Sequence, residues 1–424
     1  MSTPETSGRA KKRLALFFDG TWNDPGDNTN VWRLKLMLAS HDRQGAPQIA
    51  YYDPGVGTGV LDRFSGGAFG VGLSENVRHA YRWLMEHYDE NDEIYLFGFS
   101  RGAFTARSLA GLIARCGLLK PSAPLSFKQV YERYQQGDAV ATIYQLKYFN
   151  KTPANLEEEV LKSDTHYKRN MIKMVGVWDT VGSIGLPIGN FPGISSRTLR
   201  FHNTRLSKIV EHSYHALALD EYRSPYWAVL WTHWLHKQPK EEDKDPADDN
   251  RWVEQRWFAG AHSNVGGGYR DDLLPQRPLD WIQRKAIKCD LNFRSTLELS
   301  HTWEDDLHIP PVDSYSKFLA GIWSNIRKPY IRWVQSDPVE KIPKREQTPP
   351  ARPGWVHTVN ERVDYSVFRR CALHPEYCSR SLNEWLERKQ LDLKHILANP
   401  KRYEHLWSPV SQPGIEPAVN LATS

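Results

Sequence analysis

The segment Ile94-Tyr95-Leu96-Phe97-Gly98-Phe99-Ser100-Arg101-Gly102-Ala103 carries the strongest structural signal in this chain of 424 residues. Residues 94–97 form the near-continuous apolar run that is typical of a central parallel strand. Residues 103–116 repeat apolar side chains at helical spacing. The pattern Gly98-x-Ser100-x-Gly102 between them predicts a tight strand-to-helix turn, whose glycines permit close packing and leave the serine hydroxyl exposed. A tight structural turn without chemistry is the alternative interpretation.

The same alternation of strand and helix runs through the first two thirds of the chain. We expect further strands at residues 14–18, 49–52, 171–178 and 253–259. Helices are expected from the cap cluster at residues 28–30 and over residues 74–88, and a Gly-rich loop at residues 55–72. These elements predict an α/β fold, a mostly parallel, doubly wound sheet with helices on both faces.

The chain divides into three predicted parts. Residues 1–12 are expected to be a flexible N-terminus. Residues 13–290 are expected to form the main α/β domain, which would be the catalytic one if Ser100 has a chemical role, with a polar helical insertion or lid at about residues 120–170. Residues 291–424 are interpreted as a C-terminal cap or accessory region, with a Pro-rich crossing at residues 338–353 and helical patterns at residues 382–397.

Composition narrows the functional classes. The net charge is +5, but only Lys11-Lys12-Arg13 forms a compact basic run, which argues against nucleic-acid binding and allows at most weak membrane-surface contact. No stretch reaches the roughly 18 apolar residues that a spanning helix needs, and no signal peptide is apparent. We expect cytoplasmic synthesis, with leaderless export left open. Four cysteines without a C-x-x-C pair, Cys116, Cys289, Cys371 and Cys378, favour a reducing compartment.

A serine nucleophile needs a base and an acid. Asp179 follows the strand predicted at residues 171–178, and His262 follows the next strong one, which gives the order Ser, Asp, His of α/β-hydrolases. Asp179 has helix capping as its alternative role and Asp220 as its rival acid. His357 is the second candidate for the base.

An oxyanion hole needs two backbone donors. The Arg101 amide is the expected first donor, and Gly20 or Thr21 in the loop after the first strand supplies the second. We interpret Asp19 as bracing this loop, against Arg101, rather than as a metal or phosphate ligand. His202, His212 and His215 suggest a metal site, but without a His-Glu-x-x-His pattern we interpret the last two as ordinary helix residues.

Five blocks of sequence resemble a known family. The chain is similar to the bacterial and fungal α/β-hydrolase family whose best-understood members are phospholipase effectors of type VI secretion, specifically the first subfamily of type VI lipase effectors. The resemblance covers about residues 13–285. It implies a Ser100-Asp179-His262 triad, no metal or organic cofactor, and glycerophospholipid esters as substrates. Many relatives have aspartate where this chain has Asn264. The blocks are residues 17–23, 98–103, 177–182, 216–221 and 260–269.

These observations predict a serine ester hydrolase of the lipase or phospholipase type that works through an acyl-enzyme. A small-molecule carboxylesterase and a catalytically inactive binding module on the same fold are the alternatives. The effector branch implies a secretion or immunity partner. Trp227, Trp231 and Trp234 suit an acyl-chain pocket, but we favour a role in the core.

Overall fold

The computed structural model describes most of the chain. The described residues are 11–20, 23, 25–55, 68–149, 151–181, 209–235, 252–270, 273–297, 305–321, 324–325, 328–335, 355–377 and 379–407. The Pro-rich stretch at residues 338–353 and Cys378 therefore lie outside them.

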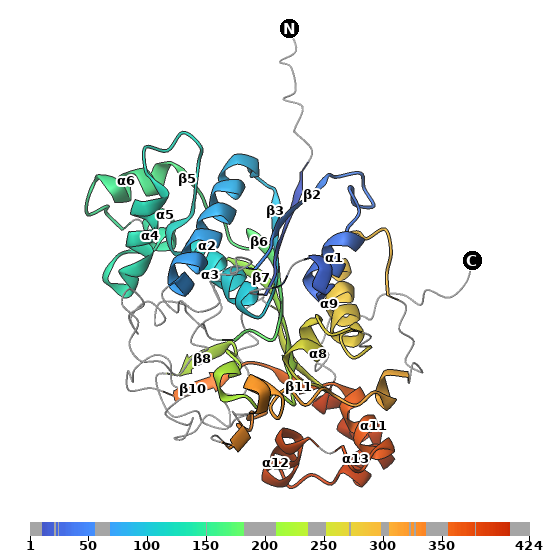
Figure 1. Cartoon of the computed structure of the whole chain (residues 1–424). Coiled ribbons are helices and arrows are strands. Elements are labelled where there is room, and N and C mark those ends of the chain that lie inside the picture. Colours follow the sequence, from blue (N-terminus) through green and yellow to red (C-terminus); the bar gives the residue numbers. More distant parts are fainter. Residues whose placement is uncertain are drawn as a thin grey trace.

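A seven-stranded sheet forms the centre of the molecule, in the order β11-β9-β7-β6-β3-β1-β2 (Figure 1). All six strand pairings are parallel, which confirms the α/β, doubly wound fold class predicted from the alternating pattern. The strands are β1 (Arg13–Phe18), β2 (Gln48–Asp53), β3 (Glu93–Phe99), β6 (Ile172–Trp178), β7 (Val210–Ala218), β9 (Trp252–Phe258) and β11 (Glu361–Val363).

Helices cover both faces of the sheet because successive strand side chains point to opposite sides. On one face, Leu14, Leu16 and Leu96 pack with α2 (Ala68–His87) and α3 (Arg101–Cys116). On the other, Phe17 and Phe97 pack with α1 (Asn30–Met37) and α9 (Gln276–Lys288), while α8 (His262–Gly266) lies at the carboxyl end of the sheet. Figure 1 shows α2 and α3 to the left of the sheet and α1 and α9 to its right.

The helical insertion lies at the far end of α3 from Ser100. Here the Cys116 thiol donates to the Val130 carbonyl at 3.7 Å, and Tyr134 packs beside Gly111. In Figure 1 this insertion is at the upper left, whereas α8 is below the middle. Of the two interpretations that the sequence left open, insertion and lid, this position favours the insertion. It comprises α4 (Phe127–Gln135), α5 (Ile143–Tyr148), α6 (Leu156–Ser163) and the paired strands β4 (Leu118–Leu119) and β5 (Thr165–His166).

The C-terminal part of the chain shares a core with the sheet. Leu217 of β7 and Trp257 of β9 are buried with Val363, Phe368 and Trp385. This part also supplies β11 to the main sheet and pairs β10 (Trp355–Thr358) with β8 (Thr232–Leu235). Its helices are α11 (Tyr365–Leu373), α12 (Arg380–Arg388) and α13 (Leu393–Ala398), and the helical patterns at residues 382–397 fall in the last two.

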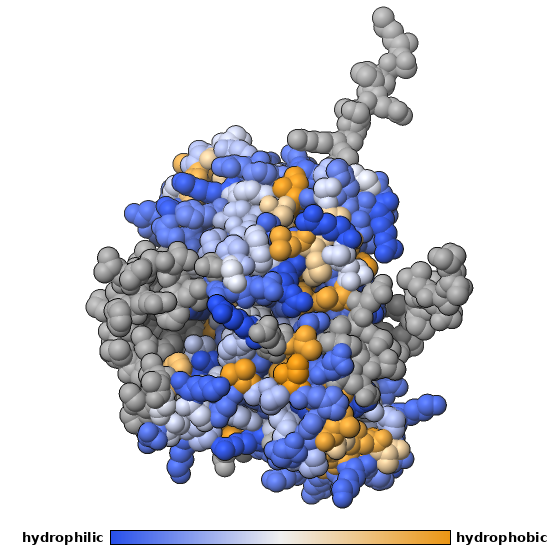
Figure 2. All heavy atoms as spheres, turned by 45° about the vertical axis from the view of Figure 1, so that its right-hand side comes forward, coloured by the Kyte–Doolittle hydropathy of each residue, from blue (hydrophilic) through white to orange (hydrophobic). Residues whose placement is uncertain are grey.

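Short 3-10 helices connect several of these elements. They are η1 (Pro25–Asp27), η2 (Gly137–Ala139), η3 (Ser224–Tyr226), η5 (Asp305–His308), η6 (Phe318–Gly321) and η7 (Pro400–Leu406). Among the described residues, the face shown in Figure 2 is mainly hydrophilic, and its hydrophobic side chains gather in separate groups.

Two local predictions need correction. His212 and His215 lie on strand β7, not on a helix, because their segment is built into the middle of the parallel sheet. The Gly-rich segment at residues 55–72 is not a loop throughout, since α2 already begins at Ala68. Within the described part of the chain, no helix is long and apolar enough to cross a bilayer. Cys116 and Cys289 are buried free thiols.

Candidate active site

Ser100 occupies the turn between β3 and α3 with φ 58° and ψ −119°. A positive φ is unusual for a residue with a side chain, and such strain is typical of functional turns. The flanking glycines make the turn possible. A Cβ on Gly98 would lie 2.5 Å from the Gly102 carbonyl oxygen, and a Cβ on Gly102 would lie 2.1 Å from the Phe18 carbonyl oxygen. The sequence pattern thus has a steric cause.

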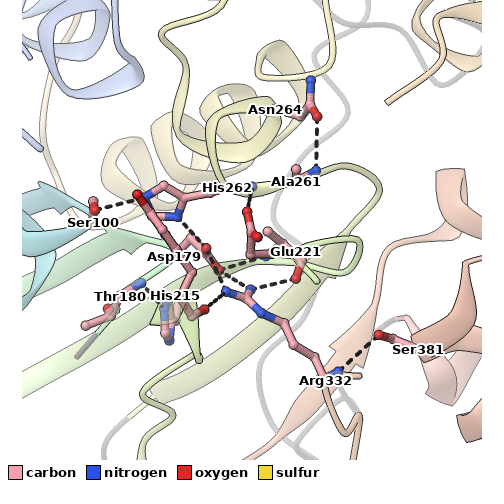
Figure 3. A network of polar contacts seen from close by, with 12 residues as sticks. Ser100, Asp179, Thr180, His215, Glu221, Ala261, His262, Asn264, Arg332 and Ser381 are labelled. Atoms are coloured by element: carbon pink, nitrogen blue, oxygen red, sulfur yellow. Dashed lines mark hydrogen bonds and ion pairs between the residues drawn. The ribbon is translucent and has the colours of Figure 1, made fainter. Parts of the chain in front are cut away.

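Ser100, His262 and Asp179 form a continuous chain of hydrogen bonds (Figure 3). His262 Nε2 is 2.8 Å from Ser100 Oγ, and His262 Nδ1 is 2.6 Å from Asp179 Oδ2. Asp179 directly follows β6 and His262 begins α8, so both groups reach Ser100 at the carboxyl end of the sheet. The structure brings together three residues that are far apart in the sequence.

The charges of this trio are set by burial and by close partners. Burial alone would raise the pKa of Asp179, but the charge of Arg332 and the hydrogen bond from His262 hold that pKa well below its ordinary value. Burial lowers the pKa of His262, against the opposing effect of Asp179. At neutral pH the carboxylate is therefore ionised and the imidazole is neutral.

The hydrogen bonds also select one form of the neutral ring. An ionised carboxylate can only accept, so His262 carries its proton on Nδ1 and donates it to Asp179. Nε2 is then the acceptor for the Ser100 hydroxyl. This is the tautomer in which a histidine can take a proton from a serine.

Arg332 is a contributor to the site that the sequence did not indicate. Its Nη1 donates to Asp179 Oδ1 at 2.6 Å and its Nη2 to Asp179 Oδ2 at 3.1 Å. Arg332 is fully buried and lies 153 positions after its partner. No local motif surrounds it, so only a three-dimensional structure could reveal the contact.

A second buried carboxylate holds the backbone of the histidine. Glu221 accepts a hydrogen bond from the His262 amide at 3.2 Å and pairs with Arg223, whose Nη2 lies 2.7 Å from Glu221 Oε2. Asn264 Oδ1 accepts from the amides of Ala261 at 3.0 Å and Val312 at 3.1 Å. Both bonds use the side-chain oxygen of Asn264.

His215 supports the other side of the site. The Thr180 amide donates to His215 Nε2 at 3.0 Å, directly after Asp179 in the sequence. Burial lowers the pKa of His215 to about 3, so this ring is a neutral structural acceptor. His202 lies outside the described residues, and no cluster of His, Cys, Asp or Glu in the described ranges is arranged to hold a metal ion. Trp231, whose ring packs edge-on against His215, is buried in the core.

The rival acid and the rival base occupy other positions. Asp220 accepts hydrogen bonds from the Gly260 amide at 2.7 Å and from the hydroxyls of Tyr222 and Tyr377. It is Asp179 that contacts the imidazole ring. His357 lies in β10, where the strand pairing sets it opposite His233.

The predicted oxyanion loop follows β1 and runs past the serine. A Cβ on Gly20 would lie 3.4 Å from the Ser100 Cβ. The Gly20 amide donates to Asp19 Oδ1 at 2.8 Å, and the choice between Gly20 and Thr21 as the second donor stays a prediction. Thr21, the alternative donor, lies outside the described residues. Arg101 is the first residue of α3, where backbone amides and the helix dipole favour negative charge.

Asp19 braces this loop from beneath. Its Oδ2 accepts hydrogen bonds from Thr29 at 2.7 Å and Tyr52 at 3.0 Å. Burial raises the pKa of Asp19 to about 6, despite these hydrogen bonds. The bracing role predicted for Asp19 thus runs through Thr29, Tyr52 and its own neighbour Gly20.

The chain is similar to one curated protein and to several solved structures. An uncharacterized protein of Saccharomyces cerevisiae is 31% identical over 246 residues, which cover 54% of this chain and 34% of that protein. The chain thus spans about a third of the length of this curated relative. Among solved structures, a Tle1 effector bound to the VgrG spike of the type VI secretion system is 18% identical, with a TM-score of 0.31, over 62% of this chain and 53% of that one. An uncharacterized protein from Pseudomonas aeruginosa is 15% identical, with a TM-score of 0.38, over 93% and 63%. Esterase 2 of Thermogutta terrifontis is 15% identical, with a TM-score of 0.34, over 67% and 85%.

A family model extends over most of the sheet and the site. The model described as the T6SS phospholipase effector Tle1-like catalytic domain matches residues 12–285, well over half of the chain. The match includes Ser100, Asp179 and His262 and ends before Arg332. The chain therefore belongs to the hydrolase family of Tle1-like phospholipase catalytic domains.

Proposed function

We propose that this protein is a serine ester hydrolase of the phospholipase type, with Ser100 as nucleophile, His262 as base and Asp179 as the acid that orients it. The observation that carries the proposal is the hydrogen-bonded chain from Asp179 Oδ2 through His262 to Ser100 Oγ, at 2.6 Å and 2.8 Å. Ser100 itself lies in a strained turn at the start of α3. Each feature has a chemical purpose in acyl transfer.

The reaction would proceed in two halves. Ser100 Oγ gives its proton to His262 Nε2 and attacks the carbonyl carbon of the ester. We expect the negative oxygen that forms to be stabilised by the amide of Arg101, the first residue of α3, and by the amide of Gly20 or Thr21. His262 then protonates the departing alcohol, which leaves the acyl group on Ser100. Water, deprotonated by His262, releases the acid and restores the hydroxyl.

The substrate class follows from the family. Members are described as phospholipase effectors, so we assign glycerophospholipid acyl esters as the substrates. Such a substrate requires contact with a lipid surface. We propose no metal or organic cofactor, because the three side chains supply the base, the nucleophile and the orienting charge.

Labelling with a fluorophosphonate probe tests the mechanism, because the probe reacts with an activated serine. Ser100→Ala should abolish both labelling and ester hydrolysis. Ser108→Ala is the matched control, since its hydroxyl lies on the same helix and donates to the Phe104 carbonyl at 2.7 Å. It should retain both activities. Full labelling of the Ser100→Ala protein would refute the nucleophile, and an unlabelled wild type would favour an inactive binding module.

The substrate needs a separate assay. Vesicles of defined phospholipids, with mass spectrometry of the products, should show fatty-acid release by the wild type and none by Ser100→Ala. Soluble esters of increasing chain length form the second arm. Hydrolysis restricted to short soluble esters would replace the phospholipase with a small-molecule carboxylesterase.

A further inference from the structure

Arg332 makes four hydrogen bonds around the acid of the site (Figure 3). Two go to the two oxygens of Asp179. The others go to the Ala218 carbonyl, at 2.6 Å from Nη1, and to the Tyr226 carbonyl from Nη2. The two-pronged contact restrains the carboxylate plane, as bidentate guanidinium pairs do. One side chain thereby ties together the ends of β6 and β7 and the turn η3.

The turn that Arg332 holds also contacts the base. The Tyr226 ring packs edge-on against the His262 imidazole, with 5.1 Å between ring centroids. Arg332 therefore acts on His262 from two sides, through the carboxylate that binds Nδ1 and through the ring that packs against the imidazole. Its own backbone amide donates to Ser381 Oγ at 3.2 Å, which anchors it to α12.

We propose that Arg332 is a positioning residue of this site, and that the segment after the family-matched domain is needed to orient Asp179 and His262. This inference rests on the proposed function, since it assigns a role within the same trio. It also reassigns the C-terminal part of the chain. That part would complete the site rather than serve as an accessory cap.

Because His262 and Arg332 share one oxygen of Asp179, the positioning role of Arg332 should affect the pKa of His262. Asp179 Oδ2 accepts from both His262 Nδ1 and Arg332 Nη2, so the arginine offsets part of the charge that would otherwise favour an imidazolium. Among the described residues, the other groups that face His262 are the Ser100 hydroxyl, the Phe99 and Tyr226 rings and Glu221, whose charge is balanced by Arg223. Removing only the Arg332 charge should therefore raise the pKa of His262.

The rate of fluorophosphonate labelling as a function of pH measures this effect, because the acid limb reports the base in the free enzyme. For Arg332→Met we expect the acid limb to move up by about one pH unit. The plateau rate should fall by at least about 10-fold as the carboxylate loses its orientation. Arg332→Lys keeps the positive charge but loses the paired N–H groups. Its acid limb should therefore lie near the pH of the wild-type limb, while its plateau rate should stay nearly as low as that of Arg332→Met.

Arg133→Met is the matched control. Arg133 is also a buried arginine paired with a carboxylate, Glu158, at 2.7 Å, but it lies in the α4–α6 insertion. It should lower stability without moving the acid limb. An Arg332→Met profile that coincides with the wild-type profile, or that changes only as the Arg133→Met profile does, would overturn the proposal.

A second readout works whether or not the protein hydrolyses esters. The proton that His262 Nδ1 shares with Asp179 should give a low-field proton NMR signal, assigned by its loss in His262→Gln. The signal should shift in Arg332→Lys. This variant provides the test if Arg332→Met does not fold. An unchanged signal would refute the positioning role. Absence of Ser100-dependent labelling in the wild type, with this NMR shift present, would reject the proposed function alone.

Discussion

Gly102 permits the closest backbone approach in the site, and replacing it by alanine tests the steric account of the turn. The new Cβ would lie 2.1 Å from the Phe18 carbonyl oxygen and 2.5 Å from the Asp19 carbonyl oxygen. A carbon and a carbonyl oxygen normally approach to about 3.3 Å. The first turn of α3 and the end of β1 must therefore separate by about 1 Å. Both obstacles are backbone atoms, so no side chain can rotate away.

The cost has two parts. Overpacking of this size destabilises a protein by about 1–3 kcal/mol. The displaced elements also carry Ser100 and the loop at Gly20, so the geometry of acyl transfer should suffer, and a misplacement of about 1 Å costs on the order of 100-fold in rate. We expect Gly102→Ala to melt at a lower temperature and to label with fluorophosphonate about 100-fold more slowly.

Gly111 on the same helix is the control. A Cβ there would lie 2.9 Å from the Tyr134 hydroxyl, the end of a side chain on α4, and not against the backbone of β1. Alanine also favours a helix interior by about 1 kcal/mol over glycine. Gly111→Ala should keep the labelling rate and the melting temperature. A Gly102→Ala protein that labels and melts like the wild type would refute the steric reasoning.

Other predictions concern charge and protonation. Asp179→Asn should slow labelling by about 10⁴-fold, because an amide that donates to Nδ1 fixes the wrong tautomer of His262; Asp220→Asn, measured alongside, should stay near the wild-type rate. The wild-type labelling rate should fall only below about pH 6.5, since burial lowers the pKa of His262 and the neutral ring is the base; a midpoint above that value would contradict this. The pKa of Asp19 is raised to about 6 in the folded state, so its contribution to stability is present below about pH 4 and is lost as pH rises towards 6. The wild type should therefore lose about 3 kcal/mol of unfolding free energy between about pH 4 and pH 6, and Asp19→Asn should not. Urea unfolding of both proteins at the two pH values measures this difference. An identical pH dependence in both proteins would show that the carboxyl is not desolvated.

The sequence predicted the parts of the fold whose periodicity is local. The apolar runs at residues 14–18 and 94–97 became β1 and β3, and the buried face of α3 follows the expected spacing. Strand β7 was missed because its histidines, three residues apart, also suit a helix. β11 was missed because three residues in an irregular region carry too little pattern.

The candidate site was predictable only where its residues follow a recognisable strand. Ser100, Asp179 and His262 each follow a recognisable strand, so their meeting at one edge of a parallel sheet could be expected. Arg332 could not be found because nothing near it in the sequence marks it. The engagement of the Gly20 amide by Asp19 depends on side-chain geometry, which a pattern of residues does not encode.

The 153-residue separation between Asp179 and Arg332 also has a consequence during synthesis. At about 5–20 residues per second, a ribosome needs roughly 8–30 s to pass from one to the other. A sheet that formed before Arg332 emerged would hold a carboxylate whose counter-charge had not yet been made. The growing chain would therefore remain a poor hydrolase until its last quarter appears, a delay that limits ester cleavage by unfinished molecules.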